Sequence, residues 1–203
     1  MRIWEEYAQN GGLLFVLSGP SGVGKDTVFK KFLTLGADVK KSISCTTRSD
    51  RGNEVNGVDY FFLTTDEFIQ RQARGFFLES ALYNGDWYGT PREWVEQQNS
   101  QGNDVMLVIE IQGAGEIKRQ RPDSVAVFIV PPSMEELERR LRDRATDSES
   151  SIKTRLATAT EELQFVSKYD YVIENDTVEK AAQELKAIVI AERNKVKRDP
   201  KRL

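Results

Sequence analysis

Four short, continuous runs of apolar residues constrain the fold of this 203-residue chain more than any other feature. A strand that is apolar at successive positions is buried on both faces, which is typical of a parallel sheet covered by helices. The runs are residues 13–17, 105–109, 125–130 and 171–173. They predict strands of the parallel sheet of an α/β domain.

Helical patterns lie between these runs. Apolar residues recur at helical spacing over 25–35, 134–141 and 177–197, and Ser133 with Glu136 has the pattern of a capping box. Strands that alternate with helices indicate βαβ units around an open parallel sheet. We therefore expect residues 1–203 to form a single domain. Its core is expected at about residues 1–41, 95–133 and 158–203.

Two segments break this alternation. Residues 42–94 hold short β-like pieces rich in glycine and aromatic residues, with one helix expected near 66–74. Residues 134–157 are highly charged and are expected to form a mobile helical flap. We predict an inserted β-rich lobe and a helical lid on the α/β core.

Composition excludes several classes of function. The chain has no histidine and one cysteine, Cys45, so Ser-His-Asp catalysis, Cys-His catalysis and a histidine zinc site are excluded. A net charge of −3 argues against a nucleic-acid partner. No apolar run approaches the ~20 residues of a membrane helix, and the first ten residues lack the apolar centre of a signal peptide. We expect a cytoplasmic protein with no membrane partner.

A glycine-rich loop follows the first apolar run and opens the first helix. It has the pattern GxxxxGK, in which backbone N–H groups, a helix N-terminus and a lysine hold the phosphates of a nucleoside triphosphate. Asp26 stands where Ser or Thr usually follows the lysine, so we expect Thr27 to line the loop near a Mg²⁺ ion carried by the phosphates. The predicted ATP-binding residues of the loop are Gly19, Pro20, Ser21, Gly22, Val23, Gly24, Lys25, Asp26 and Thr27.

Two arginines, Arg48 and Arg51, indicate a second anion site in a small polar segment. Arginines three residues apart can converge on one phosphate, and each can bind it through two hydrogen bonds. Taken alone, the segment fits two solvated surface arginines equally well.

The segment from Ser42 to Tyr60 matches the pattern S-x-S-x-T-T-R-x-x-R-x-x-E-x-x-G-x-x-Y. With Phe77-Leu78-Glu79, Trp87-Tyr88-Gly89-Thr90 and Ile111-Gln112-Gly113, this pattern resembles the guanylate kinases, which phosphorylate GMP with ATP. The resemblance runs from about Leu13 to Glu192. It implies a P-loop three-layer fold with a central parallel sheet, an inserted lobe for the nucleoside monophosphate, a helical lid and Mg²⁺ as cofactor.

The resemblance also implies roles for individual residues. Those that would bind guanine are Ser44, Glu79 and Thr90, and those that would hold the GMP phosphate are Arg48, Arg51, Tyr60 and Tyr88. Glu110, which stands in place of the usual aspartate, would also bind GMP, and Asn175 would lie beside adenine. The implied catalytic cations are Lys25, Arg48, Arg140, Arg144 and Arg155.

Physical chemistry supports some of these roles and leaves others open. A buried carboxylate at Glu79 can accept from two adjacent donors of guanine that adenine lacks, so it would select against AMP. Thr90 also fits a helix N-cap before Pro91, and Trp87 fits a core position. Val108 stands where the family commonly has another acid, so fewer protein groups are expected to hold the metal.

Two alternatives remain open from the sequence. A guanylate-kinase-like interaction module would fit the departures at Asp26 and Val108, but Lys25 is intact. A related kinase for another small phosphate, such as a ribose bisphosphate, would need no guanine contacts. Both a monomer and a homo-oligomer fit the sequence.

Overall fold

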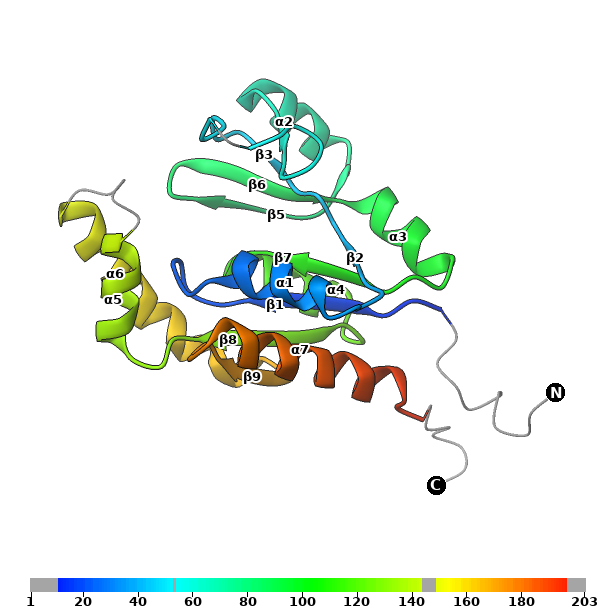
Figure 1. Cartoon of the computed structure of the whole chain (residues 1–203). Coiled ribbons are helices and arrows are strands. Elements are labelled where there is room, and N and C mark those ends of the chain that lie inside the picture. Colours follow the sequence, from blue (N-terminus) through cyan, green and yellow to red (C-terminus); the bar gives the residue numbers. More distant parts are fainter. Residues whose placement is uncertain (1–10, 53, 144–148, 197–203) are drawn as a thin grey trace.

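The larger of two β-sheets forms the centre of the protein (Figure 1). The structure is a computed structural model, and it describes residues 11–52, 54–143 and 149–196. Five parallel strands lie in the order β2-β7-β1-β8-β9, which confirms the predicted parallel sheet. Their bounds are β1 Leu14–Ser18, β2 Lys40–Lys41, β7 Val105–Val108, β8 Val125–Val130 and β9 Tyr171–Glu174.

Helices cover both faces of this sheet and make a three-layer α/β fold. Because side chains of a strand alternate between faces, Phe15 and Leu17 of β1 pack with α1 and α7, while Leu14 and Val16 pack with α3 and α4. Each such side chain contributes about 1.5–3 kcal/mol of burial free energy. The bounds of these helices are α1 Lys25–Thr34, α3 Arg92–Ser100, α4 Ile111–Gln120 and α7 Val178–Arg193.

A second sheet, in the order β4-β3-β6-β5, lies beside the first within the segment expected to be β-rich (Figure 1). Phe68 of helix α2 stacks on Phe77 and on Trp87, with ring centroids 4.3 and 5.7 Å apart. This small separate core confirms the predicted helix and the core position of Trp87. The bounds are β3 Cys45–Thr46, β4 Phe61–Phe62, α2 Thr65–Ala73, β5 Phe77–Tyr83 and β6 Asp86–Pro91.

A tight hairpin joins β5 to β6. Asn84 and Gly85 form its turn with φ angles of 50° and 88°. An Asn-Gly pair accepts such left-handed angles readily, because glycine has no Cβ and asparagine tolerates this region. The turn sets Tyr83 opposite Asp86.

The charged segment expected as a flap is helical where the structure describes it, and its mobility stays a prediction. Its helices lie together at one end of the molecule (Figure 1). Leu137 and Leu141 of the first helix pack with Ile152 and Ala159 of the second. The bounds are α5 Met134–Asp143 and α6 Glu149–Leu163, followed by the 3₁₀ helix η2 Gln164–Lys168.

One strand was missed, and two local expectations need correction. Strand β2 was not predicted, because its two lysines form no apolar run. The Ser133 capping box is only half formed: Glu136 N–H donates to Ser133 Oγ at 3.1 Å, while the Glu136 carboxylate binds Arg139 and Arg140 instead. Helix α7 ends at Arg193 rather than 197, and Lys197 lies outside the described residues.

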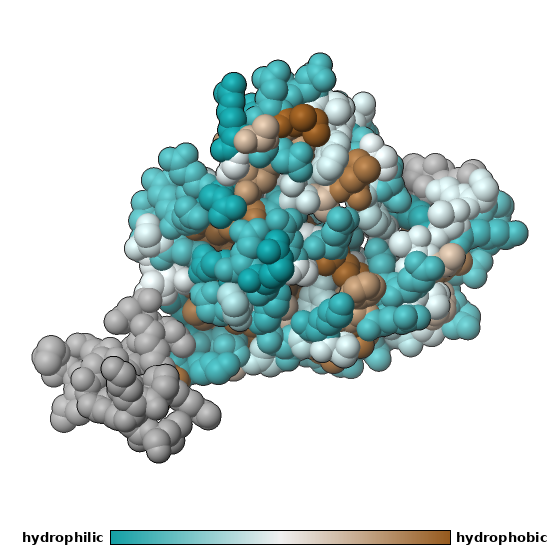
Figure 2. All heavy atoms as spheres, turned by 180° about the vertical axis from the view of Figure 1, so that it is seen from behind, coloured by the Kyte–Doolittle hydropathy of each residue, from teal (hydrophilic) through white to brown (hydrophobic). Residues whose placement is uncertain are grey.

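The face of the protein seen from behind is mostly hydrophilic, and apolar side chains emerge there in small separate spots (Figure 2). Within the described ranges, the structure contains no helix with the length and apolarity needed to cross a bilayer.

Thr64 and Glu67 form a complete capping box at the start of α2. We expect Thr64→Ala to lower the free energy of unfolding by about 1 kcal/mol, because the Glu67 N–H loses its acceptor. Urea unfolding followed by circular dichroism measures this. Thr65→Ala, at the exposed next position, is the control; an equal loss in both variants would contradict a capping role.

Candidate active site

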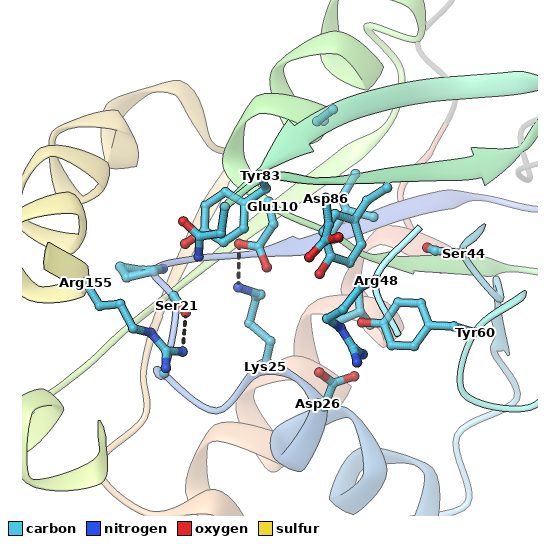
Figure 3. Close-up of a pocket in the computed structure, with 18 of the residues that line it drawn as sticks. Ser21, Lys25, Asp26, Ser44, Arg48, Tyr60, Tyr83, Asp86, Glu110 and Arg155 are labelled. Carbon is cyan, nitrogen blue, oxygen red and sulfur yellow. Dashed lines mark hydrogen bonds and ion pairs between the residues drawn. The ribbon is translucent and has the colours of Figure 1, made fainter. Parts of the chain in front are cut away.

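A cavity of about 570 Å³ lies between the glycine-rich loop, the four-stranded sheet and helix α6. The loop follows β1 and Glu110 follows β7, so both lie at the carboxyl ends of adjacent parallel strands. Ligands of open α/β sheets bind at this edge. Figure 3 shows the labelled side chains directed toward this space from the loop, the hairpin and α6.

Two glycines give the loop its shape. Gly24 has a left-handed φ of 97°, and a Cβ there would lie 2.8 Å from Nδ2 of Asn175. Gly22 has a φ of 88°, and a Cβ there would lie 2.6 Å from Leu141 of α5. The loop is therefore packed from behind, and its left-handed φ angles suit glycine, so larger residues at either position would be strained and would push the loop out of place.

Asn175 supports the loop from behind. Its side chain is 2 % exposed, and its Nδ2 donates to the carbonyl oxygen of Val23 at 2.7 Å. Asn175 and Val23 are not among the residues that line the cavity. The structure thus places Asn175 under the loop rather than on the cavity wall.

Lys25 is held across the mouth of the loop. Its Nζ donates to the carbonyl oxygen of Gly19 at 2.7 Å and to Oε2 of Glu110 at 3.1 Å (Figure 3). The Lys25 side chain is 9 % exposed, so this charge is largely withdrawn from water and is paired. Both partners keep the ammonium extended toward the cavity.

Asp26 and Thr27 are exposed and line the cavity. The Asp26 carboxylate accepts from Nζ of Lys41 at 3.3 Å. Lys41 ends strand β2, so Asp26 is partly neutralised by the neighbouring strand. Val108 also lines the cavity and brings no acid group to it.

Arg48 is fixed by an ion pair and by aromatic rings. Its Nη2 donates to Oε1 of Glu54 at 2.8 Å, and both side chains are mostly buried. Its guanidinium lies over Tyr60, 5.5 Å from the ring centroid, and Tyr60 packs edge-on to Tyr88. The hydrogen bond from Arg48 holds the pKa of the Glu54 carboxyl below its usual value. Arg51 is exposed and lines the same cavity.

Glu79 lies at the inner end of the cavity and is 4 % exposed. Its Oε1 accepts from the Thr90 hydroxyl at 2.6 Å. A Cβ on Gly113 of α4 would lie 2.3 Å from its other oxygen, so a larger residue there would displace the carboxylate. Burial raises the pKa of Glu79 to about 7, although the bond from Thr90 opposes this shift.

The interpretation of Thr90 as a helix N-cap is wrong. Thr90 lies in strand β6, and Pro91 is the N-cap of α3 without a side-chain bond. The Thr90 hydroxyl is fully buried and is turned to Glu79 instead. Satisfying a buried carboxylate outweighs capping a helix end that solvent reaches.

The predicted arginines of the lid differ in their position relative to the cavity. Arg155 lines the cavity, and its Nη2 donates to Oγ of Ser21 at 2.7 Å (Figure 3). Arg140 is absent from the lining; it binds Glu136 and the carbonyl oxygen of Asn175, each at 2.8 Å. Arg144 lies outside the described residues.

Several cavity residues were not predicted. The hairpin brings Tyr83, Asn84 and Asp86 to the cavity, and α6 brings Thr154. The Asn-Gly dipeptide signals a hairpin, but no residue pattern shows which way that hairpin points. Ser44 and Tyr88, which were predicted, do line the cavity.

The buried carboxyl of Glu79 predicts a pH-dependent stability. The pKa of Glu79 is higher in the folded protein than in the unfolded chain. Below about pH 5 the protonated carboxyl therefore contributes to the stability of the fold, and this stabilisation is lost as the pH rises to about 7. The amide of Glu79→Gln does not titrate. We therefore expect the free energy of unfolding of Glu79→Gln, minus that of the wild type, to increase by roughly 1–3 kcal/mol from pH 5 to pH 8. Thermal unfolding at both pH values measures it. A difference that stays constant with pH would contradict the raised pKa.

Comparisons with known proteins agree with this geometry. The guanylate kinase family model matches residues 12–192. The guanylate kinase of Desulfitobacterium hafniense (strain Y51) is 48 % identical over 192 residues, which cover 95 % of this chain and 96 % of that protein. The guanylate kinase of Bacillus subtilis (strain 168) is 49 % identical over 188 residues, with 92 % of each chain covered.

A solved structure gives the same result for the fold. The crystal structure of guanylate kinase from Anaplasma phagocytophilum aligns with a TM-score of 0.79 and 37 % sequence identity, covering 92 % of this chain and 89 % of that chain. A phosphate loop and a buried acid meet in one cavity, and the likeness extends over nearly the whole chain. We conclude that this chain belongs to the guanylate kinase family.

Proposed function

We propose that the cavity catalyses the ATP-dependent phosphorylation of GMP to GDP, and that the individual residues act as follows. The observation that carries this proposal is the cavity itself, which joins the phosphate loop with Lys25 to the buried Glu79 at its inner end. We assign the four-stranded sheet with α2 as the lobe that binds GMP. Helices α5 and α6 form the lid.

Glu79 is proposed to recognise guanine. Guanine presents N1–H and an amino group side by side, and one carboxylate can accept from both. Adenine lacks this pair, so AMP would leave the buried carboxylate without the donors that guanine supplies, which costs about 1–3 kcal/mol or more. Thr90 holds one carboxylate oxygen in place, and Ser44 lines the cavity nearby as a further polar contact.

The GMP phosphate is proposed to bind Arg48, Arg51, Tyr60 and Tyr88, which all line the cavity. Glu54 and the Tyr60 ring already hold the Arg48 guanidinium in one place. Such fixed donors lose little conformational entropy when phosphate binds.

The loop from Gly19 to Thr27 is proposed to hold the ATP phosphates through its backbone N–H groups. Lys25 would then exchange part of its pairing with Glu110 for the outer phosphates. Asn175 keeps the loop in shape from behind through its bond to Val23.

Mg²⁺ is the proposed cofactor, and the residues present fit it. The cavity wall near the loop carries the oxygen donors of Asp26, Thr27 and Glu110, the ligand type that Mg²⁺ prefers. Within the described residues no three acids converge as a metal cage, so these groups would hold an ion that arrives with the phosphates and its own waters. When bound, it neutralises phosphate charge.

The transfer step needs positioning and positive charge rather than a base. The GMP phosphate is itself the nucleophile, which suits a chain without histidine. Arg155 already lies at the cavity, and Arg140 lies one layer behind it, against Asn175. Arg144 would join them from the lid. Closing the lobe and lid would exclude water that otherwise hydrolyses ATP.

The proposed compartment is the cytoplasm. Cys45 is buried and free, and a chain with one cysteine can form no internal disulfide. The interaction-module alternative loses support, because the guanylate kinases reported above share close to half of their residues with this chain.

A coupled assay of ADP release tests the proposed function. The acceptors are GMP, dGMP, AMP, CMP and UMP, each with Mg-ATP. We expect strong turnover with GMP and little with AMP, CMP or UMP. GMP-independent ADP release, or equal turnover with AMP, would contradict the proposal.

Lys25→Ala is expected to lower kcat by about 10³-fold, because the transferred phosphoryl group loses its nearest fixed cation. The same assay measures kcat, and circular dichroism checks that the fold is retained. Lys30→Ala removes an exposed lysine from the same helix and is expected to leave kcat unchanged. Near-normal turnover of Lys25→Ala would reject the proposed mechanism.

Glu79→Gln is expected to reduce the preference for GMP over AMP, measured as a ratio of kcat/KM, by about tenfold or more. The amide accepts less strongly from guanine and can donate to adenine. Glu96→Gln, on the exposed surface of α3, is the matched control. An unchanged ratio would remove Glu79 from the guanine site.

A further inference from the structure

Two side chains of helix α6 bind the same residue of the phosphate loop, Ser21. Arg155 and Glu162 are seven residues apart on α6, about two helical turns, so they lie on one face. Arg155 Nη2 donates to Oγ of Ser21 at 2.7 Å, and the Ser21 N–H donates to Oε2 of Glu162 at 3.4 Å. Ser21 is therefore held by a cation through its side chain and by an acid through its backbone.

Glu162 lies beside the loop, close to Lys25 and Glu110. Ser21 and Arg155 line the cavity, but Glu162 is not among the lining residues. The Ser21 N–H is thus directed at the Glu162 carboxylate of α6.

The surroundings of Glu162 disfavour the charged form of its carboxyl group. Burial and the nearby Glu110 carboxylate raise its pKa to about 7, while Lys25 and the Ser21 N–H oppose the shift. Tyr83 and Tyr169 also face this group of charges. A second acid so close to a phosphate site weakens anion binding. Its presence there therefore calls for another role.

Helix α6 is also held by apolar contacts. Its buried side chains, Ile152 and Ala159, pack against Leu137 and Leu141 of α5. That apolar contact holds the two helices to each other but gives no directional bond to Ser21. Arg155 and Glu162 supply directional bonds from α6 to Ser21.

We propose that Glu162 is a positioning residue for phosphoryl transfer. It fastens α6 to the loop at the Ser21 N–H, so that Arg155, two turns away on the same face, reaches the cavity beside the ATP phosphates. This inference rests on the proposed function, and it assigns a task to a residue that does not touch the substrates.

The test compares Glu162→Ala and Glu162→Gln with the wild type in the ADP-release assay. The matched control is Glu161→Ala, at the exposed neighbouring position on the same helix. We expect Glu162→Ala to lower kcat about tenfold to a hundredfold, because a misplaced catalytic group is costly. KM for GMP and the melting temperature are expected to stay unchanged. Glu162→Gln keeps an acceptor oxygen and should retain most of the kcat.

Three results would overturn the inference: wild-type kcat in Glu162→Ala, an equal loss of kcat in Glu162→Gln, or an equal loss in Glu161→Ala. If Glu162→Ala does not fold, Glu162→Asp takes its place. Aspartate withdraws the carboxylate by one methylene, so it should lose kcat while Glu162→Gln retains it, and equal kcat in the two would also overturn the inference. An inactive wild type would instead reject the proposed function.

Discussion

The burial of β1 on both faces is the constraint on which the rest of the structure depends. Phe15 and Leu17 pack against one layer of helices, and Leu14 and Val16 against the other. A strand in this position must pair with parallel neighbours on each side, here β7 and β8. Parallel strands end at a common edge, so the loop after β1 and Glu110 after β7 meet there.

Most cations of the cavity are held by the protein's own groups before any substrate arrives. Lys25 is bound by Gly19 and Glu110, Arg48 by Glu54, and Arg155 by Ser21. Internal pairing keeps these long side chains extended and lowers the entropy lost on binding phosphate. It also offsets the free-energy cost of placing several like charges around one cavity.

Much of the site was predictable because its residues belong to long, ordered motifs. The loop, Glu79, Arg48 and Tyr60 were all expected from the sequence, and all except Gly19 and Val23 of the loop line the cavity. Other positions carried no such signal. Tyr83 and Asp86 reach the cavity because the hairpin at Asn84 and Gly85 is aimed there. Their distance from the loop in the sequence hides this contact.

The sequence by itself determined the α/β class, the phosphate loop and the resemblance to guanylate kinases, because apolar runs, glycine spacing and motifs are local properties of the chain. Only the tertiary structure decided that Thr90 binds Glu79 rather than capping α3, and that Asn175 lies under the loop. It also brought Glu162 to Ser21, 141 residues away. Each of these contacts joins segments that are separated in the sequence. The packing of the sheets and helices determines which of the possible partners comes within hydrogen-bond distance of each polar group.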